Sequence, residues 1–160
     1  LGLWVANNDK NSSFEGQAFN TLPNLKKQFP FRYDDASQRT IELIDVIWFD
    51  GNSICAAFEV EHTSSVYSGI LRMADLMAMQ PNIDIPLYIV APDERREKVI
   101  REINRPIFKQ ALRKPLAQIC RYISYSALLE KFEIARNQGF LSHLTPSILD
   151  EIAEEVDTDI

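Results

Sequence analysis

Apolar residues recur along the chain in two spacings, one typical of β-strands and one typical of α-helices. Short apolar or β-branched runs predict β-strands at residues 2–6, 40–49, 53–61, 85–90 and 117–124. Apolar residues at helical spacing predict helices at residues 14–29, 63–79, 93–103 and 126–138, with a last helix from Thr145 and Pro146 onwards. In the first helix Gly16 and Pro23 oppose the helical conformation, and residues 30–38 are expected to form a loop.

Turn and cap residues support these borders. The step from Asp50 to Gly51 between the second and third strands predicts a β-hairpin. Asp93 and a hydroxyl residue among 63–65 are expected to cap helices, and Gly139 is expected to end one. The order of elements predicts an α/β fold in which a mixed central sheet lies between helices.

The composition fits one globular domain over residues 1–160. Hydrophobic residues make up 46% of the chain and charged residues 25%. No apolar run approaches the roughly 18 residues of a membrane-spanning helix, so no membrane contact is expected. The chain contains neither a Rossmann nor a P-loop motif, and no Cys/His set suits structural zinc. Cys55 and Cys120 lie in apolar runs, which favours buried reduced thiols over a disulfide and a cytoplasmic location.

Charge is unevenly distributed along the chain, whose net charge is -6. Residues 93–121 contain nine Lys or Arg and four Asp or Glu, whereas residues 144–160 contain six acidic residues and no basic ones. This distribution permits a basic face on an acidic protein. The acidic end is expected to be a solvated helix end and tail.

Three carboxylates lie in predicted strands, where acidic residues are uncommon. Asp45 is in strand 40–49, and Glu59 and Glu61 end strand 53–61. Alternation places Glu59 and Glu61 on one face, and the hairpin can bring Asp45 beside them. Such crowded carboxylates are most simply compensated by a divalent cation, and oxygen ligands favour Mg²⁺ or Mn²⁺. The alternative is that Glu59 and Glu61 face solvent on an edge strand while Asp45 ends its strand.

The run from Asp45 through a turn to Glu59-Val60-Glu61 and then a helix resembles the PD-(D/E)xK nuclease superfamily. The resemblance implies a restriction endonuclease-like αβββαβ core over about residues 14–124, with extra C-terminal helices at 126–160. It also implies a metal-dependent endonuclease in which Asp45 and Glu59 bind the ion and Glu61 completes the catalytic set. Two positions depart from the motif, because Glu61 replaces the usual Lys and Ile44 the usual Pro. Residues 58–73 are also similar to a run in uncharacterised bacterial proteins related to restriction enzymes.

Two neighbouring residues are further candidates for the same site. Glu15, near the start of the first predicted helix, resembles in position an additional acidic residue that some superfamily members place near the metal. His62 follows Glu61 and points to the opposite face of a continuing strand. A supporting or structural role for His62 is therefore favoured over that of a general base.

Five basic residues are candidates for contacts with DNA phosphates. Arg72 lies in the helix that follows the carboxylates, and its alternative role is an ion pair with Asp75. The stretch between residues 105 and 114 contains no acidic residue, so backbone contact there is reasonable. The candidates in this stretch are Arg105, Lys109, Arg113 and Lys114. Their alternative is a solvated helix surface.

Two functions from different classes follow. The first is a Mg²⁺- or Mn²⁺-dependent DNA endonuclease, such as the cleavage domain of a restriction-type enzyme. The second is a nuclease-like fold that has lost cleavage and binds DNA or assembles a complex, for which the missing Lys is the main argument. A hydrolase acting on sugars is a more distant alternative. Cleavage of both strands favours a homodimer, and the domain could be part of a larger chain or complex.

Overall fold

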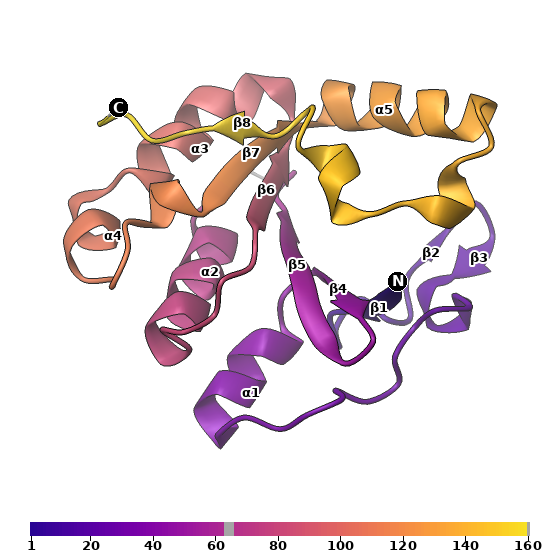
Figure 1. Ribbon diagram of the computed structural model, residues 1–160, viewed down its shortest axis with the longest axis horizontal. Helices are drawn as coiled ribbons and strands as arrows, with labels where there is room; N and C mark the ends of the chain where they lie inside the picture. The colour runs from indigo at the N-terminus through magenta and orange to yellow at the C-terminus, as the bar shows by residue number, and fades with distance from the viewer. Residues whose placement is uncertain (63–65, 160) are drawn as a thin grey trace.

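The computed structural model describes residues 1–62 and 66–159, and a six-stranded mixed sheet runs through its centre (Figure 1). The spatial order is β1-β4-β5-β6-β7-β8. The first three neighbours pair antiparallel, β5, β6 and β7 run parallel, and β8 returns antiparallel to β7. The strands are β1 (Gly2–Val5), β4 (Val46–Asp50), β5 (Ser53–Val60), β6 (Leu87–Ala91), β7 (Cys120–Ser124) and β8 (Glu154–Glu155). The predicted fold class, a mixed sheet between helices, is confirmed.

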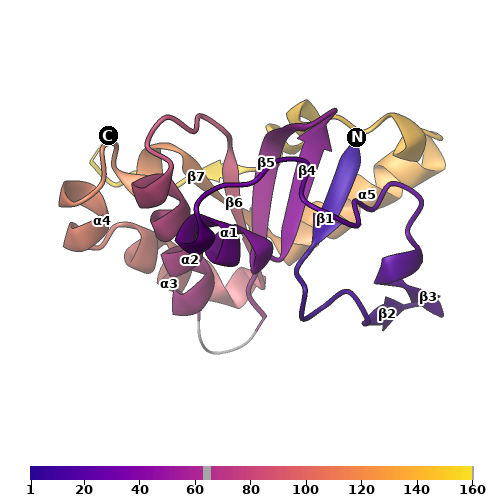
Figure 2. The ribbon, with the colours of Figure 1, turned by 90° about the horizontal axis from the view of Figure 1, so that it is seen from below.

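Helices cover both faces of this sheet (Figures 1 and 2). One core cluster joins the sheet to α1, α2, α3 and α4, and a second joins its other face to α5 and the segment after it. The helices are α1 (Asp35–Glu42), α2 (Tyr67–Met79), α3 (Arg96–Ile103), α4 (Pro106–Gln110) and α5 (Tyr125–Asn137). Short 3₁₀ turns are η1 (Phe19–Thr21), η2 (Asp93–Arg95), η3 (Leu116–Gln118), η4 (Leu141–His143) and η5 (Pro146–Leu149).

The elements with the strongest sequence patterns form as expected. Gly51 adopts a positive φ of 59° in the hairpin turn, where Asp50 pairs with Ser53. All of β6 is buried, as its continuous apolar run predicts for a central strand. Helix α2 forms from Tyr67, while the caps predicted among residues 63–65 lie outside the described residues.

The predictions for residues 14–49 are partly wrong. Residues 14–29 form no α-helix but a small hairpin, β2 (Ser13–Phe14) and β3 (Gln17–Ala18), followed by η1. Its turn uses positive φ angles at Glu15 and Gly16, which a helix does not allow. Residues predicted as loop and strand instead form α1, because the Asp34 carboxylate caps the backbone N–H groups of Ala36 and Ser37. Strand β4 therefore starts only at Val46. The first α-helix of the chain, α1, comes after β1 and the small hairpin and directly before β4.

The C-terminal predictions also need correction. The last helix is reduced to the 3₁₀ turn η5, and the acidic end adds strand β8 to the sheet instead of remaining a solvated tail. Arg96 and Arg121 pair with the glutamates of β8, which compensates the acidic strand. Asp93 does not cap its own helix, because its carboxylate accepts a hydrogen bond from the N–H of Ser126.

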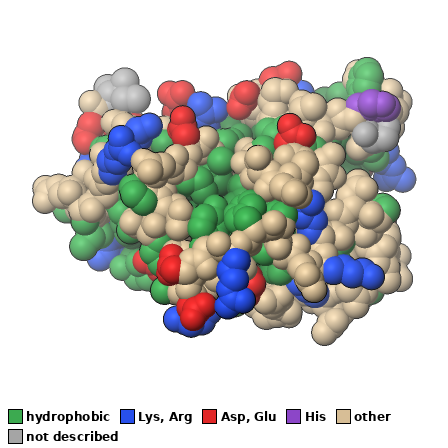
Figure 3. Space-filling model, turned by 60° about the horizontal axis from the view of Figure 1, so that its bottom comes forward, with side chains coloured by type: hydrophobic (Ala, Val, Ile, Leu, Met, Phe, Trp, Pro, Cys, Tyr) green, Lys and Arg blue, Asp and Glu red, His purple; other side chains and the backbone are tan. Residues whose placement is uncertain are grey.

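Three further features of the described residues bear on the sequence predictions. No helix within residues 1–62 and 66–159 is long and apolar enough to cross a membrane. Both cysteines are free, with Cys120 buried and Cys55 half-buried. Hydrophobic side chains gather in the middle of one face of the molecule (Figure 3).

Candidate active site

Asp45 and Glu59 lie opposite each other on one face of the sheet. Val46 pairs with Phe58 in the antiparallel register of β4 and β5, so the preceding residue, Asp45, faces Glu59. Asp45 stands in a bend just before β4 rather than in the middle of a strand. Its Oδ2 accepts a hydrogen bond of 2.7 Å from the N–H of Val60. The open end of the β4–β5 hairpin, away from its turn, therefore places the two carboxylates side by side.

Glu59 is completely buried and is bound by an arginine from α2. The Nε and Nη2 atoms of Arg72 donate hydrogen bonds of 2.7 Å to the two carboxylate oxygens of Glu59. Burial raises the pKa of Glu59 to about 9; the negative charge of Asp45 adds to this effect, and Arg72 opposes it. The hydrogen bonds from Arg72 therefore offset only part of the cost of burying this carboxylate. The pKa of Arg72 is raised by the same hydrogen bonds.

Glu61 completes the cluster and is held by the first turn of α2. Its Oε1 accepts a hydrogen bond of 2.8 Å from the N–H of Gly69, and burial raises the pKa of its carboxyl group. A Cβ atom at Gly69 would lie 2.1 Å from this oxygen. The helix can approach the carboxylate this closely only because residue 69 is a glycine.

The donor set of the site suits a hard divalent cation. Asp45 and Glu61 each use one oxygen for a backbone N–H and retain a second oxygen. Within residues 1–62 and 66–159, no group of three or more His, Cys, Asp or Glu side chains is arranged to hold a metal ion. Mg²⁺ commonly uses only one or two carboxylates and completes its shell with water and phosphate oxygens, so Asp45 and Glu59 are enough for it if Glu59 shares its oxygens with Arg72.

The two further residues predicted for this site, Glu15 and His62, are both exposed. Glu15 is exposed in the turn between β2 and β3, and this hairpin lies beside β1 rather than beside β5 (Figures 1 and 2). His62 is exposed directly after Glu61. Burial raises the pKa of Tyr125, and the negative charges of Glu61 and Asp45 add to this effect. Sequence reasoning missed this tyrosine, which begins α5 and packs against the second core cluster.

The predicted phosphate contacts are mostly engaged within the protein. Arg72 pairs with Glu59 instead of Asp75. The guanidinium of Arg105 pairs with Glu102 and lies 5.1 Å from the ring centre of Tyr67. Lys109 pairs with Asp159, and Arg113 donates to the side chain of Asn82, whereas Lys114 is exposed.

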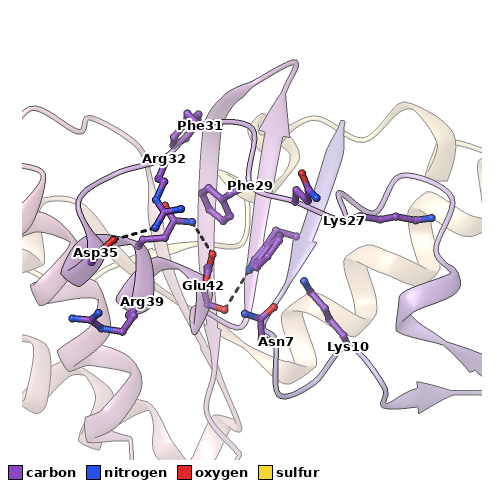
Figure 4. Close-up of a pocket in the computed structure, with 12 residues that line it drawn as sticks. Asn7, Lys10, Lys27, Phe29, Phe31, Arg32, Asp35, Arg39 and Glu42 are labelled. Carbon is purple, nitrogen blue, oxygen red and sulfur yellow. Dashed lines mark hydrogen bonds and ion pairs between the residues drawn. The ribbon is translucent and has the colours of Figure 1, made fainter.

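A separate groove contains basic residues that sequence reasoning missed. It has a volume of about 780 Å³ and lies between α1, β1 and the segment that leads into α1 (Figure 4). Its basic side chains are Lys10, Lys27, Arg32 and Arg39, and its aromatic ones are Trp4, Phe29 and Phe31. These residues are scattered over the first quarter of the sequence, so no local charge cluster revealed them.

Comparisons with known proteins identify the family. The family model described as "Type II restriction enzyme NmeDI C-terminal domain" matches residues 1–156. The chain is 33% identical over 138 residues to the type II restriction enzyme NmeDI of Neisseria meningitidis serogroup C, a match that covers 82% of this chain and 37% of that enzyme. No solved structure matches the chain. The chain therefore belongs to the family of the C-terminal domain of the type II restriction enzyme NmeDI.

Proposed function

We propose that this chain is a DNA endonuclease domain of the PD-(D/E)xK type that uses Mg²⁺ or Mn²⁺ to hydrolyse phosphodiester bonds. Its relation to a type II restriction enzyme supports DNA as the substrate. The geometry supports the carboxylate cluster as the place of reaction, because Asp45 and Glu59 share one face at the end of the hairpin.

The observation that carries this proposal is the incomplete charge compensation of Glu59. This side chain has no exposed surface, faces Asp45, and retains a raised pKa despite two hydrogen bonds from Arg72. Asp45 and Glu59 would hold a divalent cation between them, and such an ion would supply the missing positive charge. Each oxygen of Glu59 accepts one hydrogen bond from Arg72 and has a second lone pair, so Glu59 would hold an ion either beside Arg72 or in place of one of its hydrogen bonds.

Each residue of the cluster then has a distinct task. Asp45 and Glu59 would hold the ion, which when bound polarises the phosphodiester and lowers the pKa of water. Glu61 takes the place of the usual Lys, and its second oxygen would orient the attacking water while the N–H of Gly69 fixes the first. A guanidinium released from Glu59 would be available to a phosphate oxygen.

The test is cleavage of supercoiled plasmid DNA in Mg²⁺ and in Mn²⁺. Glu59→Gln keeps the size of the side chain but removes the charge that holds the ion, so we expect loss of cleavage with an unchanged circular dichroism spectrum. Glu130→Gln makes the same chemical change on the exposed surface of α5 and should cut like wild type. Full activity of Glu59→Gln would remove Glu59 from the mechanism.

A second candidate is a DNA-binding or assembly module without cleavage. It is favoured by Arg72, whose two hydrogen bonds already give Glu59 a positive partner without any metal. Glu61 in place of the motif Lys argues in the same direction. Inactivity of wild type and Glu59→Gln alike, together with no Mn²⁺ binding in calorimetry, would favour this candidate.

We also propose that the active form is a homodimer or part of a larger assembly. Cutting both strands of a duplex calls for two active sites, and this chain carries one carboxylate cluster of the kind described above among its described residues. Light scattering with and without DNA measures the stoichiometry. A monomer that cuts both strands in one binding event would contradict this expectation.

A further inference from the structure

The groove between α1 and β1 carries a net positive charge on an acidic protein. Four basic and two acidic side chains line it, a balance of +2, whereas the whole chain has a net charge of -6. Arg32 and Arg39 lie at one end of the groove, Lys10 and Lys27 lie at the other, and Phe29 stands between them (Figure 4). Two separated positive ends with an aromatic centre suit an extended polyanion better than a single small anion.

Several of these cations are available to a ligand. Lys27 and Arg39 are exposed, and neither side chain makes a hydrogen bond or ion pair with any residue that the structure describes. Arg32 pairs only with the exposed Asp35, at 3.1 Å, and the Nζ atom of Lys10 lies 3.6 Å from the ring centre of Trp4. Three of the four basic residues of the 105–114 stretch differ in this respect, because Arg105, Lys109 and Arg113 are engaged within the protein, whereas Lys114 is exposed.

Aromatic rings form the wall between the two charged ends. Phe29 packs edge-on against Trp4 and Phe31, with ring centres 4.9 and 5.6 Å apart. Trp4 is buried, but Phe29 and Phe31 are only half-buried and line the hollow. Any nucleic-acid base can stack on a ring of this kind, so such a contact does not depend on the nucleotide sequence.

The groove is built on the same structural elements as the carboxylate pair. Ala6 donates its backbone N–H to the carbonyl oxygen of Asp45 at 3.0 Å, and the next residue, Asn7, lines the groove. Trp4 pairs with Ile47, which pairs with Ala57 two residues before Glu59 on β5. Trp4 therefore projects from the face of the sheet that also carries Glu59.

From this arrangement we propose that the groove holds one strand of the DNA substrate beside the cleavage site, with its phosphates on Lys27 and Arg39 and a base against Phe31. This inference rests on the proposed function for the identity of the nucleic acid. It assigns binding of the DNA substrate to α1 and the segment before it, instead of to the basic stretch at residues 105–114.

The test measures DNA binding without cleavage. Fluorescence anisotropy in EDTA, with labelled single-stranded and duplex DNA at several salt concentrations, compares wild type with the double variant Lys27→Ala/Arg39→Ala. We expect weaker binding, and a salt slope (log affinity against log salt) that is smaller by about 1.4 for single strands and about 1.8 for duplex, because two phosphate contacts are lost. Arg101→Ala/Arg136→Ala removes the same charge from exposed positions on α3 and α5 and should leave the slope unchanged.

Phe31→Leu is the second variant, because it keeps an apolar side chain while it removes the stacking surface. We expect about 5-fold or greater loss of affinity for single-stranded DNA, with the salt slope unchanged. Equal affinity and slope for wild type and the Lys27/Arg39 variant, or no DNA binding by wild type at 50 mM salt, would overturn the inference. Tighter binding of RNA than of DNA of the same sequence would overturn the assignment to DNA.

These outcomes are independent of those for the proposed function. If Lys27→Ala/Arg39→Ala binds DNA like wild type while Glu59→Gln abolishes cleavage, the endonuclease stands and the groove assignment fails. If the groove variants lose binding in a protein that never cleaves, the groove assignment stands and the endonuclease fails. Binding by Glu59→Gln in EDTA at neutral pH should equal that of wild type, because the buried Glu59 keeps its proton there and the substitution removes no charge.

Discussion

In metal-free buffer, raising the pH should destabilise this domain through Glu59. The pKa of this carboxyl group is about 9 in the folded protein, and the reference value for an exposed glutamate is roughly 4.3. Between these values the folded state retains a proton that the unfolded state releases. The stability that the buried carboxyl group contributes is therefore fully present below the lower pKa and is lost as the pH rises towards the higher one.

The size of the effect follows from the number of protons. One proton changes the free energy of unfolding by about 1.4 kcal/mol per pH unit, so Glu59 alone accounts for at most about 3 kcal/mol between pH 6 and pH 8. Glu61 acts in the same direction, because burial also raises its pKa. Its contribution remains in variants of Glu59, and a comparison between such variants isolates Glu59.

Urea unfolding followed by circular dichroism in EDTA at pH 6, 7 and 8 measures this dependence. Glu59→Gln does not titrate at residue 59, so its stability should fall less steeply than that of wild type, and it should be the more stable protein at pH 8. Glu130→Gln, on the exposed surface of α5, should follow wild type. Parallel curves for wild type and Glu59→Gln would refute the reasoning, because they would mean that Arg72 keeps Glu59 ionised throughout.

Two more predictions concern the same cluster. Mn²⁺ at 100 times its dissociation constant should stabilise wild type by about 2.7 kcal/mol in thermal or urea unfolding and should leave Glu59→Gln unchanged, whereas equal shifts would place the ion elsewhere. Gly69→Ala brings a Cβ atom to 2.1 Å from Oε1 of Glu61, and we expect it to lower the free energy of unfolding by about 1–3 kcal/mol despite the better helix propensity of Ala. Wild-type stability of that variant in urea unfolding would show that the Glu61 side chain or the helix can move apart without cost.

Elements with a strong local pattern could be predicted from the sequence, and α1 shows why others could not. The run from Ile41 to Phe49 is apolar enough to resemble one long strand, and residues 35–40 are polar except for Ala36. The structure divides this run at Asp45, because Ile41 is buried as part of a capped helix whereas Val46 begins the strand. The cap at Asp34 was the available signal, but a single cap residue carries less weight than a long apolar run.

The site shows the same contrast between local and distant information. Strand alternation and a two-residue turn were enough to predict that Asp45 and Glu59 share a face. The partner of Arg72 was not predictable, because Glu59 and Asp75 were both within reach of a helix whose orientation the sequence does not define. The groove depends on the way that the fold brings Lys10 and Arg39 to its two ends, and nothing in their local sequences marks them.

When all three carboxylates of the cluster are ionised, the positive charge beside them does not balance their negative charge. Asp45, Glu59 and Glu61 together carry three negative charges, and Arg72 brings one positive charge to them. Protons or a metal ion can make up the difference, and they compete for the same oxygens. If metal affinity rises with pH over the range in which metal-free stability falls, a bound metal ion provides the positive charge that the cluster lacks. If stability falls and no ion binds, Arg72 is the permanent partner of Glu59 and the domain binds DNA without cutting it.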